Sequence, residues 1–344
     1  MPSSTFVPAG ARSDRHGFDF PGRILSSNPA AALVDVILFR AHLPASLEAG
    51  SERRLKKADA LPFAAIAAIL AIACAVTLAG SDDGDSIGEM PVFALCAVIA
   101  FAVQWVVFVP SFLARTEHYF DLTGSATYVT VVAVAVIATG NWEPRSLIIA
   151  ALIGAWAFRL GPFLFLRARR SGGDRRFDVM KTHFPSFLLT WTLQGLWVLL
   201  TASAGLAAIT TKSPEPVEWV AFLGIAVWLA GFAIEVVADA QKSAFKKDPA
   251  NEGRFITTGL WAWSRHPNYF GEIVLWTGIA IVAIPVLSGW QWLTLVSPVF
   301  VFVLLTRISG IPTLDRRARR RWGDDPAYQQ YRRRTPVLVP RPPR

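Results

Sequence analysis

The stretch 257–276 reads TTGLWAWSRHPNYFGEIVLW and joins a polar, aromatic segment to an apolar helix. Its centre, residues 265–272, holds an Arg, a His, an Asn, a Tyr and a Glu. A membrane helix does not need so many polar groups at its mouth, because polar groups are costly to bury in lipid. We therefore expect this stretch to form part of a binding or catalytic site at a membrane surface.

The composition is typical of an all-α, polytopic membrane protein. Of the 344 residues, 53% are hydrophobic and only 17% are charged, whereas soluble domains carry about 25% charged residues. The net charge of +9 does not predict a nucleic-acid partner, because the basic loops of membrane proteins face the cytoplasm and anionic lipid. Membrane lipid is the expected surface partner.

Eight apolar segments are long enough to cross the hydrocarbon core, which takes about 20 residues per helix. The predicted transmembrane bundle, 61–312, has spans at 61–79, 91–112, 123–140, 146–166, 186–209, 217–239, 270–287 and 290–308. A cytoplasmic or interfacial segment, 1–60, precedes it, and a basic cytoplasmic tail, 313–344, follows it. Within the first segment, residues 30–43 are apolar but too short to span, which predicts an interfacial helix.

The loops between these spans alternate in charge. One set holds seven acidic and two basic residues: Asp82, Asp83, Asp85, Glu89, Glu143, Glu215 and Glu218 against Arg145 and Lys212. The other set holds the basic run 167–176 and the Arg-rich tail. By the positive-inside rule, both termini lie in the cytoplasm, and the polar motifs face it from a bacterial cytoplasmic membrane.

Three charged residues within or beside the spans need partners. Arg159 lies in the fourth apolar run, and Glu235 and Asp239 end the sixth. The spacing of the two acids places both on one helix face, where they repel each other unless a cation or donor is near. Candidate partners are Arg159, Arg254, Arg265 or ligand hydroxyls. The alternatives are a purely structural salt bridge, or an Arg159 that extends along the lipid to the membrane surface.

A second polar cluster, 117–121, reads EHYFD and precedes the third span, which contains Tyr128. His118 and His266 lack the spacing to other ligands that a metal site needs, so no metal is predicted. Pro267 disfavours helix at His266, and we expect Asn268 to cap the helix that follows. Such a helix start in cationic surroundings favours anion binding.

The run 259–272 resembles the C-terminal signature of the steroid 5α-reductase superfamily, and is most similar to its bacterial branch of uncharacterised membrane proteins. The resemblance covers roughly residues 115–340. It extends to Trp156, Arg159 and Gly161, to 173–177, to Asp239, Gln241 and Lys242, to 251–255, to 309–312, and to Tyr328, Tyr331, Thr335 and Pro336. The Arg-His-Pro-x-Tyr run alone is less specific, because isoprenylcysteine methyltransferases and sterol reductases share it.

The resemblance implies an NADPH-dependent reductase of a C=C bond in an apolar enone, either steroid-like or another lipid. It implies a cofactor site built from Arg159, Arg167, Asp174, Glu235, Asp239, Lys242, Asn251, Arg254, Arg265, His266, Asn268, Tyr269, Glu272, Tyr328 and Tyr331. Two residues depart from the family pattern. Glu235 stands where steroid reductases have an Asn, and Trp156 replaces a Tyr, which removes the usual phenolic donor.

The proton-donating residue is less clear than the cofactor site. The family's acidic residue on an early helix has no certain counterpart, and Asp121, then Glu117, are the candidates. Tyr119 or Tyr128 could replace the missing phenol. Hydride transfer to an enone builds negative charge on the carbonyl oxygen, so a nearby acid must donate to it.

Two other functions remain open. A membrane methyltransferase that uses S-adenosylmethionine would share the Arg-His-Pro run and the Glu272 position, but its cofactor lacks phosphates and gives less reason for the basic run 167–176. A non-enzymatic lipid-binding or transport protein would use the polar cluster structurally. No Gly-x-Gly-x-x-Gly run in a Rossmann setting occurs, so a dinucleotide would have to bind within the bundle.

Overall fold

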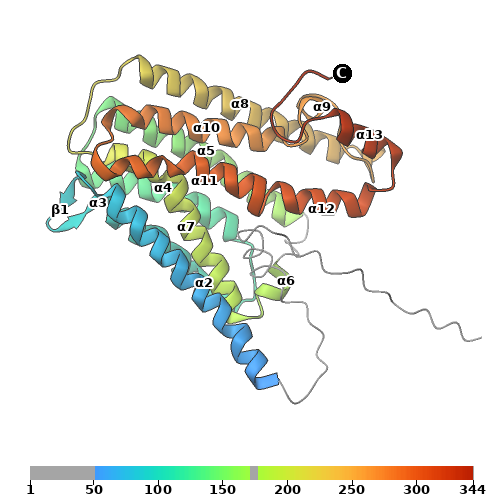
Figure 1. Cartoon of the computed structure of the whole chain (residues 1–344), viewed down its shortest axis with the longest axis horizontal. Helices are drawn as coiled ribbons and strands as arrows, with labels where there is room; N and C mark the ends of the chain where they lie inside the picture. Colours follow the sequence, from blue (N-terminus) through green and yellow to red (C-terminus); the bar gives the residue numbers. More distant parts are fainter. Residues whose placement is uncertain (1–50, 171–176, 344) are drawn as a thin grey trace, which may run out of the picture.

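Eight helical segments long and apolar enough to cross a membrane make up most of the described chain, residues 51–170 and 177–343 of the computed structural model (Figure 1). They run over Ala60–Gly80, Val92–Leu113, Phe120–Thr139, Pro144–Arg167, Phe184–Ile209, Trp219–Lys247, Pro267–Val286 and Gly289–Trp322. The all-α fold and all eight predicted spans are thereby confirmed. The predicted interfacial helix at 30–43 and the candidate residue Asp174 lie outside the described residues.

The long helices follow one another with short connections. They are α2 (Ser51–Gly80), α3 (Val92–Leu113), α4 (Phe120–Thr139), α5 (Pro144–Arg170), α7 (Phe184–Ile209), α8 (Trp219–Lys247) and α10 (Pro267–Ala283), which η2 (Ile284–Val286) extends. The last span is composite: η3 (Gly289–Leu295), α11 (Val296–Val303), the π-helical η4 (Leu304–Ile308) and α12 (Ile311–Trp322). Short elements complete the described chain: the antiparallel strands β1 (Ser86–Ile87) and β2 (Met90–Pro91), then α6 (Phe177–Met180), η1 (Pro249–Asn251), α9 (Leu260–Trp263) and α13 (Pro326–Arg334).

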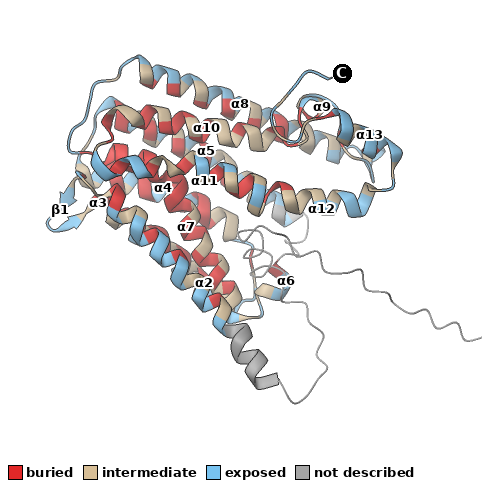
Figure 2. Ribbon diagram, in the orientation of Figure 1, coloured by how far each residue is buried: buried red, intermediate tan, exposed pale blue. Residues whose placement is uncertain are grey.

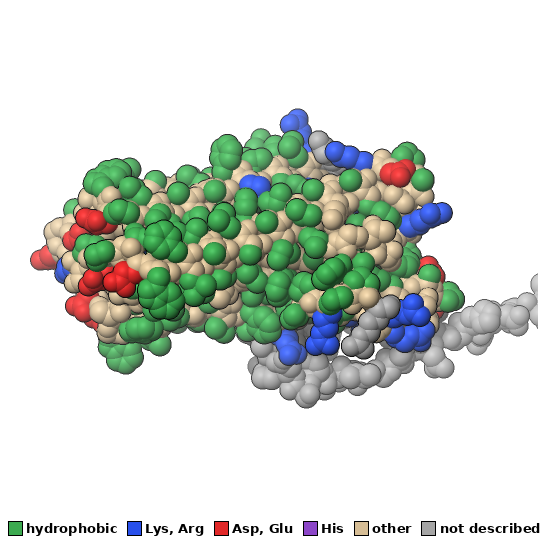
Figure 3. All heavy atoms as spheres, turned by 90° about the horizontal axis from the view of Figure 1, so that it is seen from above, with side chains coloured by type: hydrophobic (Ala, Val, Ile, Leu, Met, Phe, Trp, Pro, Cys, Tyr) green, Lys and Arg blue, Asp and Glu red, His purple; other side chains and the backbone are tan. Residues whose placement is uncertain are grey.

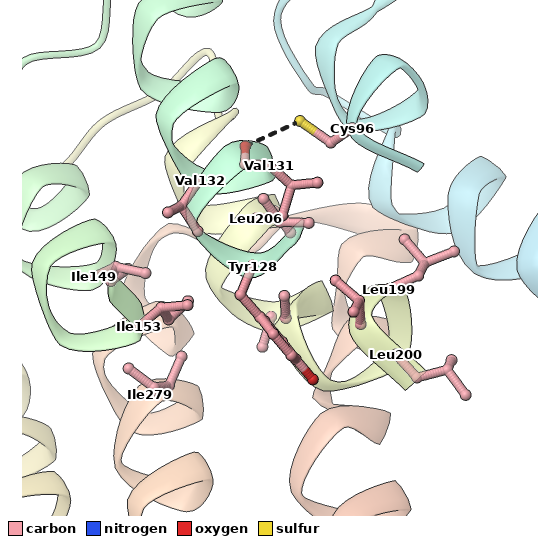
Figure 4. Close-up of a cluster of buried hydrophobic side chains, with 14 of the residues drawn as sticks. Cys96, Tyr128, Val131, Val132, Ile149, Ile153, Leu199, Leu200, Leu206 and Ile279 are labelled. Carbon is pink, nitrogen blue, oxygen red and sulfur yellow. Dashed lines mark hydrogen bonds between the residues drawn. The ribbon is translucent and has the colours of Figure 1, made fainter. Parts of the chain in front are cut away.

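Helix α7 is the centre of the bundle. In its most apolar stretch 89% of the residues are buried, against 17% in α2 (Figure 2). A helix that is apolar on all sides belongs in the interior, and α7 packs against α2, α3, α4 and α11. Figure 4 shows the core beside it, where Tyr128 of α4 lies among aliphatic side chains from α4, α5, α7 and α10.

Helices α8 and α10 approach each other closely because glycines line their contact. A Cβ atom on Gly231 of α8 would lie 2.5 Å from the backbone nitrogen of Leu275. One on Gly271 of α10 would lie 2.6 Å from the carbonyl oxygen of Gly231. Small residues permit this approach in membrane proteins. The contact places Glu272, next to Gly271, alongside the acidic end of α8.

Charge is divided between the two ends of the molecule. Figure 3 shows acidic side chains gathered at the end that carries β1, basic side chains mainly at the opposite end, and a hydrophobic surface between them. Eight crossings place the start of the first span and the end of the last on the same side. That this basic side is cytoplasmic stays a prediction from the positive-inside rule.

Candidate functional site

Arg159 of α5 binds both acidic residues at the end of α8. Its Nη1 lies 2.5 Å from Glu235 Oε1, and its Nη2 lies 2.6 Å from Asp239 Oδ2. The carboxylate side chains are only 3% and 9% exposed. The predicted common face of Glu235 and Asp239 and their pairing with Arg159 are therefore confirmed. Arg159 does not reach along the lipid to the surface, because its guanidinium is engaged inside the bundle.

Trp156, which takes the place of the family's Tyr, also contacts this pair. Its indole nitrogen donates to Glu235 Oε2 at 3.2 Å, and its ring packs edge-on against Tyr128 at 5.1 Å between centroids. Glu235 thus receives hydrogen bonds on both carboxylate oxygens, one from Trp156 and one from Arg159. The substitution of an indole for a phenol leaves a donor at this position, but not a titratable one.

Glu272 of α10 adds a third carboxylate to this site. It lies close enough to interact electrostatically with Glu235, Asp239 and Arg159. We call Glu235, Asp239 and Glu272 the carboxylate cluster; it faces a single guanidinium. Asn268, one turn before Glu272, shares its helix face. Within the described chain, neither side chain has a hydrogen-bond partner, so both remain available to a ligand.

Four basic residues gather next to the carboxylate cluster, toward the basic end of the molecule. Lys242 and Lys246 of α8 interact with each other and with Arg167 of α5, and Lys246 also interacts with Arg321 of α12. We call these four residues the cationic group. The interactions among them are repulsive, and Asp239 offsets part of the charge at Lys242. Such an accumulation of cations favours an anionic ligand.

One face of α5 connects the carboxylate cluster to the cationic group. The guanidinium carbons of Arg159 and Arg167 lie 5.1 and 5.7 Å from the centre of the Phe163 ring. The three residues are four apart, so they line the same helix face. Sequence reasoning missed Lys246 and Arg321. The first could have been found, because it lies one turn after Lys242 on the same face.

His266 is buried at the entrance to α10. Its ring stacks on Tyr269 at 5.6 Å between centroids, and its Nδ1 has no hydrogen-bond partner among the described residues. Burial, with a smaller effect of Lys242, lowers its pKa from 6.5 to about 4. The imidazole is therefore neutral near pH 7.

The expected capping role of Asn268 is wrong. Helix α10 begins at Pro267, and His266 precedes it with φ −140° and ψ 60°. Proline fits the first helical position because the backbone N–H that it lacks would have no partner there. Asn268 therefore lies inside the first turn, and its amide is not used as a cap.

The C-terminal tail folds back over the segment that precedes His266, as the sequence suggested. Ser264 Oγ donates to the carbonyl of Leu338 at 2.7 Å, and the backbone nitrogen of Arg341 donates to that of Trp263 at 3.0 Å. Tyr331 donates its hydroxyl to the carbonyl of Trp261 at 2.7 Å. The predicted cofactor residue Tyr331 thus has a structural bond.

The other predicted cofactor residues lie around this folded tail or in the loop after α8. Arg265 pairs with Asp315 at 3.3 Å, and Tyr328 packs against Phe255 at 5.1 Å between ring centroids. The side-chain amide of Asn251 donates to the carbonyl of Phe245 at 3.1 Å, and Arg254 is exposed. Their printed sequence positions converge on one end of the molecule, but these contacts do not join them to the carboxylate cluster.

The candidate proton donors before α4 occupy a separate place. Glu117 is buried and pairs with Lys181 at 3.2 Å. Tyr119 is exposed and stacks on Phe165, and Asp121 lies half-buried in the first turn of α4. Tyr128, two turns further along α4, is buried and interacts electrostatically with Glu272. Of these groups, Tyr128 has the clearest contact with the carboxylate cluster.

Comparisons with known proteins give a family and one partial relative. The sequence model of a family described as "Protein of unknown function (DUF1295)" matches residues 105–335. The chain is also similar to a protein named "Probable O-methyltransferase ustE" from Ustilaginoidea virens, with 33% identity over 60 residues. That stretch spans 17% of this chain and 21% of the relative, so the chain matches about a fifth of that protein's length.

Proposed function

Since the chain belongs to the DUF1295 family of proteins of unknown function, we propose from its own residues that it is an NADPH-dependent membrane reductase. The substrate would be an apolar, lipid-like or steroid-like enone that enters from the bilayer. The cofactor would enter from the cytoplasmic side of a bacterial cytoplasmic membrane. The resemblance to steroid 5α-reductases supports this proposal, and so does the distribution of charge at the site.

The observation that carries the proposal is the placement of the cationic group beside the carboxylate cluster. NADPH has ribose hydroxyls and a carboxamide at one end, which suit carboxylate and amide side chains. Its three phosphates suit clustered Lys and Arg side chains. Glu272 and Asn268 offer acceptors and donors without internal partners, while Lys242 and Lys246 lie one and two turns beyond Asp239's position on α8. The order along α8 matches the order of groups along the cofactor.

When bound, the cofactor would supply the hydride, and the protein would orient the reactants and stabilise charge. Negative charge would develop on the enone oxygen, where a donor must lie. Tyr128 is our leading donor because it is buried and interacts with Glu272. Asp121 remains a candidate. Glu117 is a weaker one, because the ammonium of Lys181 favours its ionised form.

Binding of NADPH to the purified full-length chain in detergent tests the cofactor proposal. We expect Glu272→Ala to raise the Kd for NADPH at least tenfold, because it removes an acceptor from the site. Glu143→Ala is the matched control, since Glu143 is exposed at the opposite end of the molecule. The proposal fails if the wild-type chain does not bind NADPH, or if both variants lose affinity equally.

A second pair of variants tests the phosphate contacts. Lys246→Gln should raise the Kd for NADPH about tenfold, since a hydrogen bond to a charged group contributes about 1.5–3 kcal/mol. Lys212→Gln removes the same charge from an exposed residue at the acidic end and should leave the Kd unchanged. Equal effects of the two variants would indicate only nonspecific attraction.

Methyl transfer from S-adenosylmethionine is the second candidate, because of the stretch similar to the probable O-methyltransferase. The sulfonium cation of that cofactor would suit the carboxylate cluster. It has no phosphates, however, and would leave the cationic group without a ligand. Titration of both cofactors into the same preparation separates the two functions. Tight binding of S-adenosylmethionine that Lys246→Gln does not alter, without NADPH binding, would favour methyl transfer.

A further inference from the structure

Asp315 of α12 is surrounded by three guanidinium groups from different parts of the chain. Arg265 lies 3.3 Å from one carboxylate oxygen, and Arg319 and Arg332 lie 3.4 and 3.9 Å from the other. We call Arg265, Arg319 and Arg332 the arginine cluster. One carboxylate cannot neutralise three guanidinium groups, so the cluster retains about two positive charges.

Two N–H groups in this cluster are buried and lack acceptors. Arg265 Nε and Arg332 Nε have no hydrogen-bond partner among the described residues. The side chains of Arg265 and Arg332 are only 11% and 29% exposed, so water replaces the missing partners poorly. An unsatisfied buried donor costs about 1–3 kcal/mol. The same two side chains thus combine surplus charge with unused donors.

The surroundings hold the two arginines in place. The backbone nitrogen of Arg265 donates to the carbonyl of Pro336 at 2.9 Å, which ties the loop before α10 to the tail. The guanidinium carbon of Arg332 lies 5.9 Å from the centre of the buried Tyr328 ring. Tyr328 in turn packs between Phe255 and Trp322. The cluster is therefore a positioned group of donors and not a set of flexible surface side chains.

We propose that the arginine cluster binds a phosphate group, as a phosphomonoester or phosphodiester, between Arg265 and Arg332. The two surplus charges match the one or two negative charges of such a group. The planar guanidinium also suits phosphate, because it can donate two parallel hydrogen bonds to its oxygens. Asp315 keeps the guanidinium groups oriented and apart. A lipid headgroup and a soluble phosphate compound share this chemistry, and the inference does not depend on the reaction proposed above.

Inorganic phosphate is the probe for the site itself. It is titrated against the full-length chain in non-ionic detergent at constant ionic strength, with thermal unfolding as the readout. We expect saturable stabilisation, and an apparent Kd at least tenfold higher for Arg332→Gln. Arg333→Gln is the matched control, because Arg333 is the next residue of α13 and is exposed. Equal responses of the three proteins, or no response of the wild type, would overturn the proposal.

A second variant guards against misfolding of the first. If Arg332→Gln unfolds at a clearly lower temperature without phosphate, Arg319→Gln takes its place, because Arg319 is 59% exposed and removing its charge should disturb packing little. It should weaken phosphate binding several-fold. Unchanged binding in a stable Arg319→Gln protein would contradict the role of the surplus charge.

Two further arms identify the source of the phosphate group. Native mass spectrometry after reconstitution with phosphatidylcholine and phosphatidylglycerol should show a retained lipid that Arg332→Gln loses, if the group belongs to a lipid. Competition between NADPH and inorganic phosphate would instead assign it to a soluble cofactor. Either result supports the site. Arg332→Gln that binds NADPH normally would leave the cofactor proposal standing, so the two proposals can fail separately.

Discussion

Arg159 is the residue on which the polar interior of the bundle depends. A charge at the centre of a membrane helix costs about 2.5–3.5 kcal/mol on insertion scales, and Arg159 offsets its own cost by binding Glu235 and Asp239. Breaking a buried ion pair from one side is worse than removing both partners, because it leaves an uncompensated charge. The pair is therefore expected to show strong energetic coupling.

We predict that Arg159→Gln destabilises the chain by about 3–5 kcal/mol, and that adding Glu235→Gln recovers part of the loss. Thermal unfolding of the four proteins of this double-mutant cycle in detergent provides the measurement. Arg169→Gln serves as the control, because Arg169 is exposed on the same helix. Additive losses from the two substitutions would show that the ion pair contributes no net coupling.

His266 gives the molecule a defined pH dependence. Its pKa in the folded chain is about 4, against 6.5 for the free side chain, mainly because it is buried. Between these two values the unfolded chain binds a proton that the folded chain does not. Stability from this residue is therefore present above pH 6.5 and is lost as the pH falls toward 4, by roughly 3 kcal/mol at most. Lys242 and Arg265 oppose protonation, and Asp315 favours it.

We expect His266→Asn to flatten the dependence of the unfolding temperature on pH between 4 and 6.5. The comparison uses slopes and not absolute temperatures, because the substitution also changes packing. His118→Asn is the control, since His118 is exposed. A wild-type slope that is unchanged in His266→Asn would mean that other groups set the pH response.

At this scale the sequence predicts contacts within a helix turn better than contacts through a folded loop. The pairing of Glu235, Asp239 and Arg159 followed from spacing and from the cost of charge in lipid. Asp315, by contrast, meets Arg265 across 50 residues, and nothing in the pattern of α12 distinguishes its acid from a solvated one. The arginine cluster becomes visible only once the tail is seen to fold back.

The helices themselves were predictable because the bilayer fixes their length and hydropathy. Their ends were less so. Helix α8 continues to Lys247, well beyond the predicted end of its span at 239, and this extension carries both lysines of the cationic group. Helix α10 starts at Pro267, before the expected cap. Hydropathy marks where a helix leaves the membrane and not where it stops.

The α8–α10 contact yields a prediction in which one substitution has opposite effects at two positions. Gly271→Ala should destabilise the chain by about 1–3 kcal/mol and weaken cofactor binding, because its Cβ would lie 2.6 Å from the Gly231 carbonyl oxygen and 2.7 Å from the Glu235 nitrogen. Backbone atoms cannot move aside as a flexible side chain can. The helices must separate instead, which shifts Glu272 away from Glu235.

Gly154→Ala in α5 is the matched control, because no atom lies within 4 Å of the Cβ position there. Alanine favours the helix over glycine by about 1 kcal/mol, so this variant should be neutral or more stable. Both are measured by thermal unfolding, and Gly271→Ala also by its Kd for NADPH. If the two variants behaved alike, the close approach of α8 and α10 would not limit stability.

For the whole molecule, the charge pattern along the sequence and the charge pattern in space agree. The acidic loops predicted for one side lie together near β1, and the basic segments lie mainly at the other end (Figure 3). The carboxylate cluster, the cationic group and the arginine cluster all involve helix ends or loops of the basic end. A cytoplasmic cofactor can reach them only if that end faces the cytoplasm.

Cysteine labelling in intact bacterial cells tests this orientation. In a chain whose Cys74 and Cys96 are replaced by alanine, we expect Ser86→Cys to react with a membrane-impermeant maleimide and Ala327→Cys to react only after the cells are opened. Both positions are exposed, so access and not burial decides the result. The reverse pattern would place the cationic group outside the cell, where NADPH is not supplied. It would therefore overturn the reductase proposal and the orientation together, while phosphate binding by the arginine cluster would still be possible through the lipid of the outer leaflet.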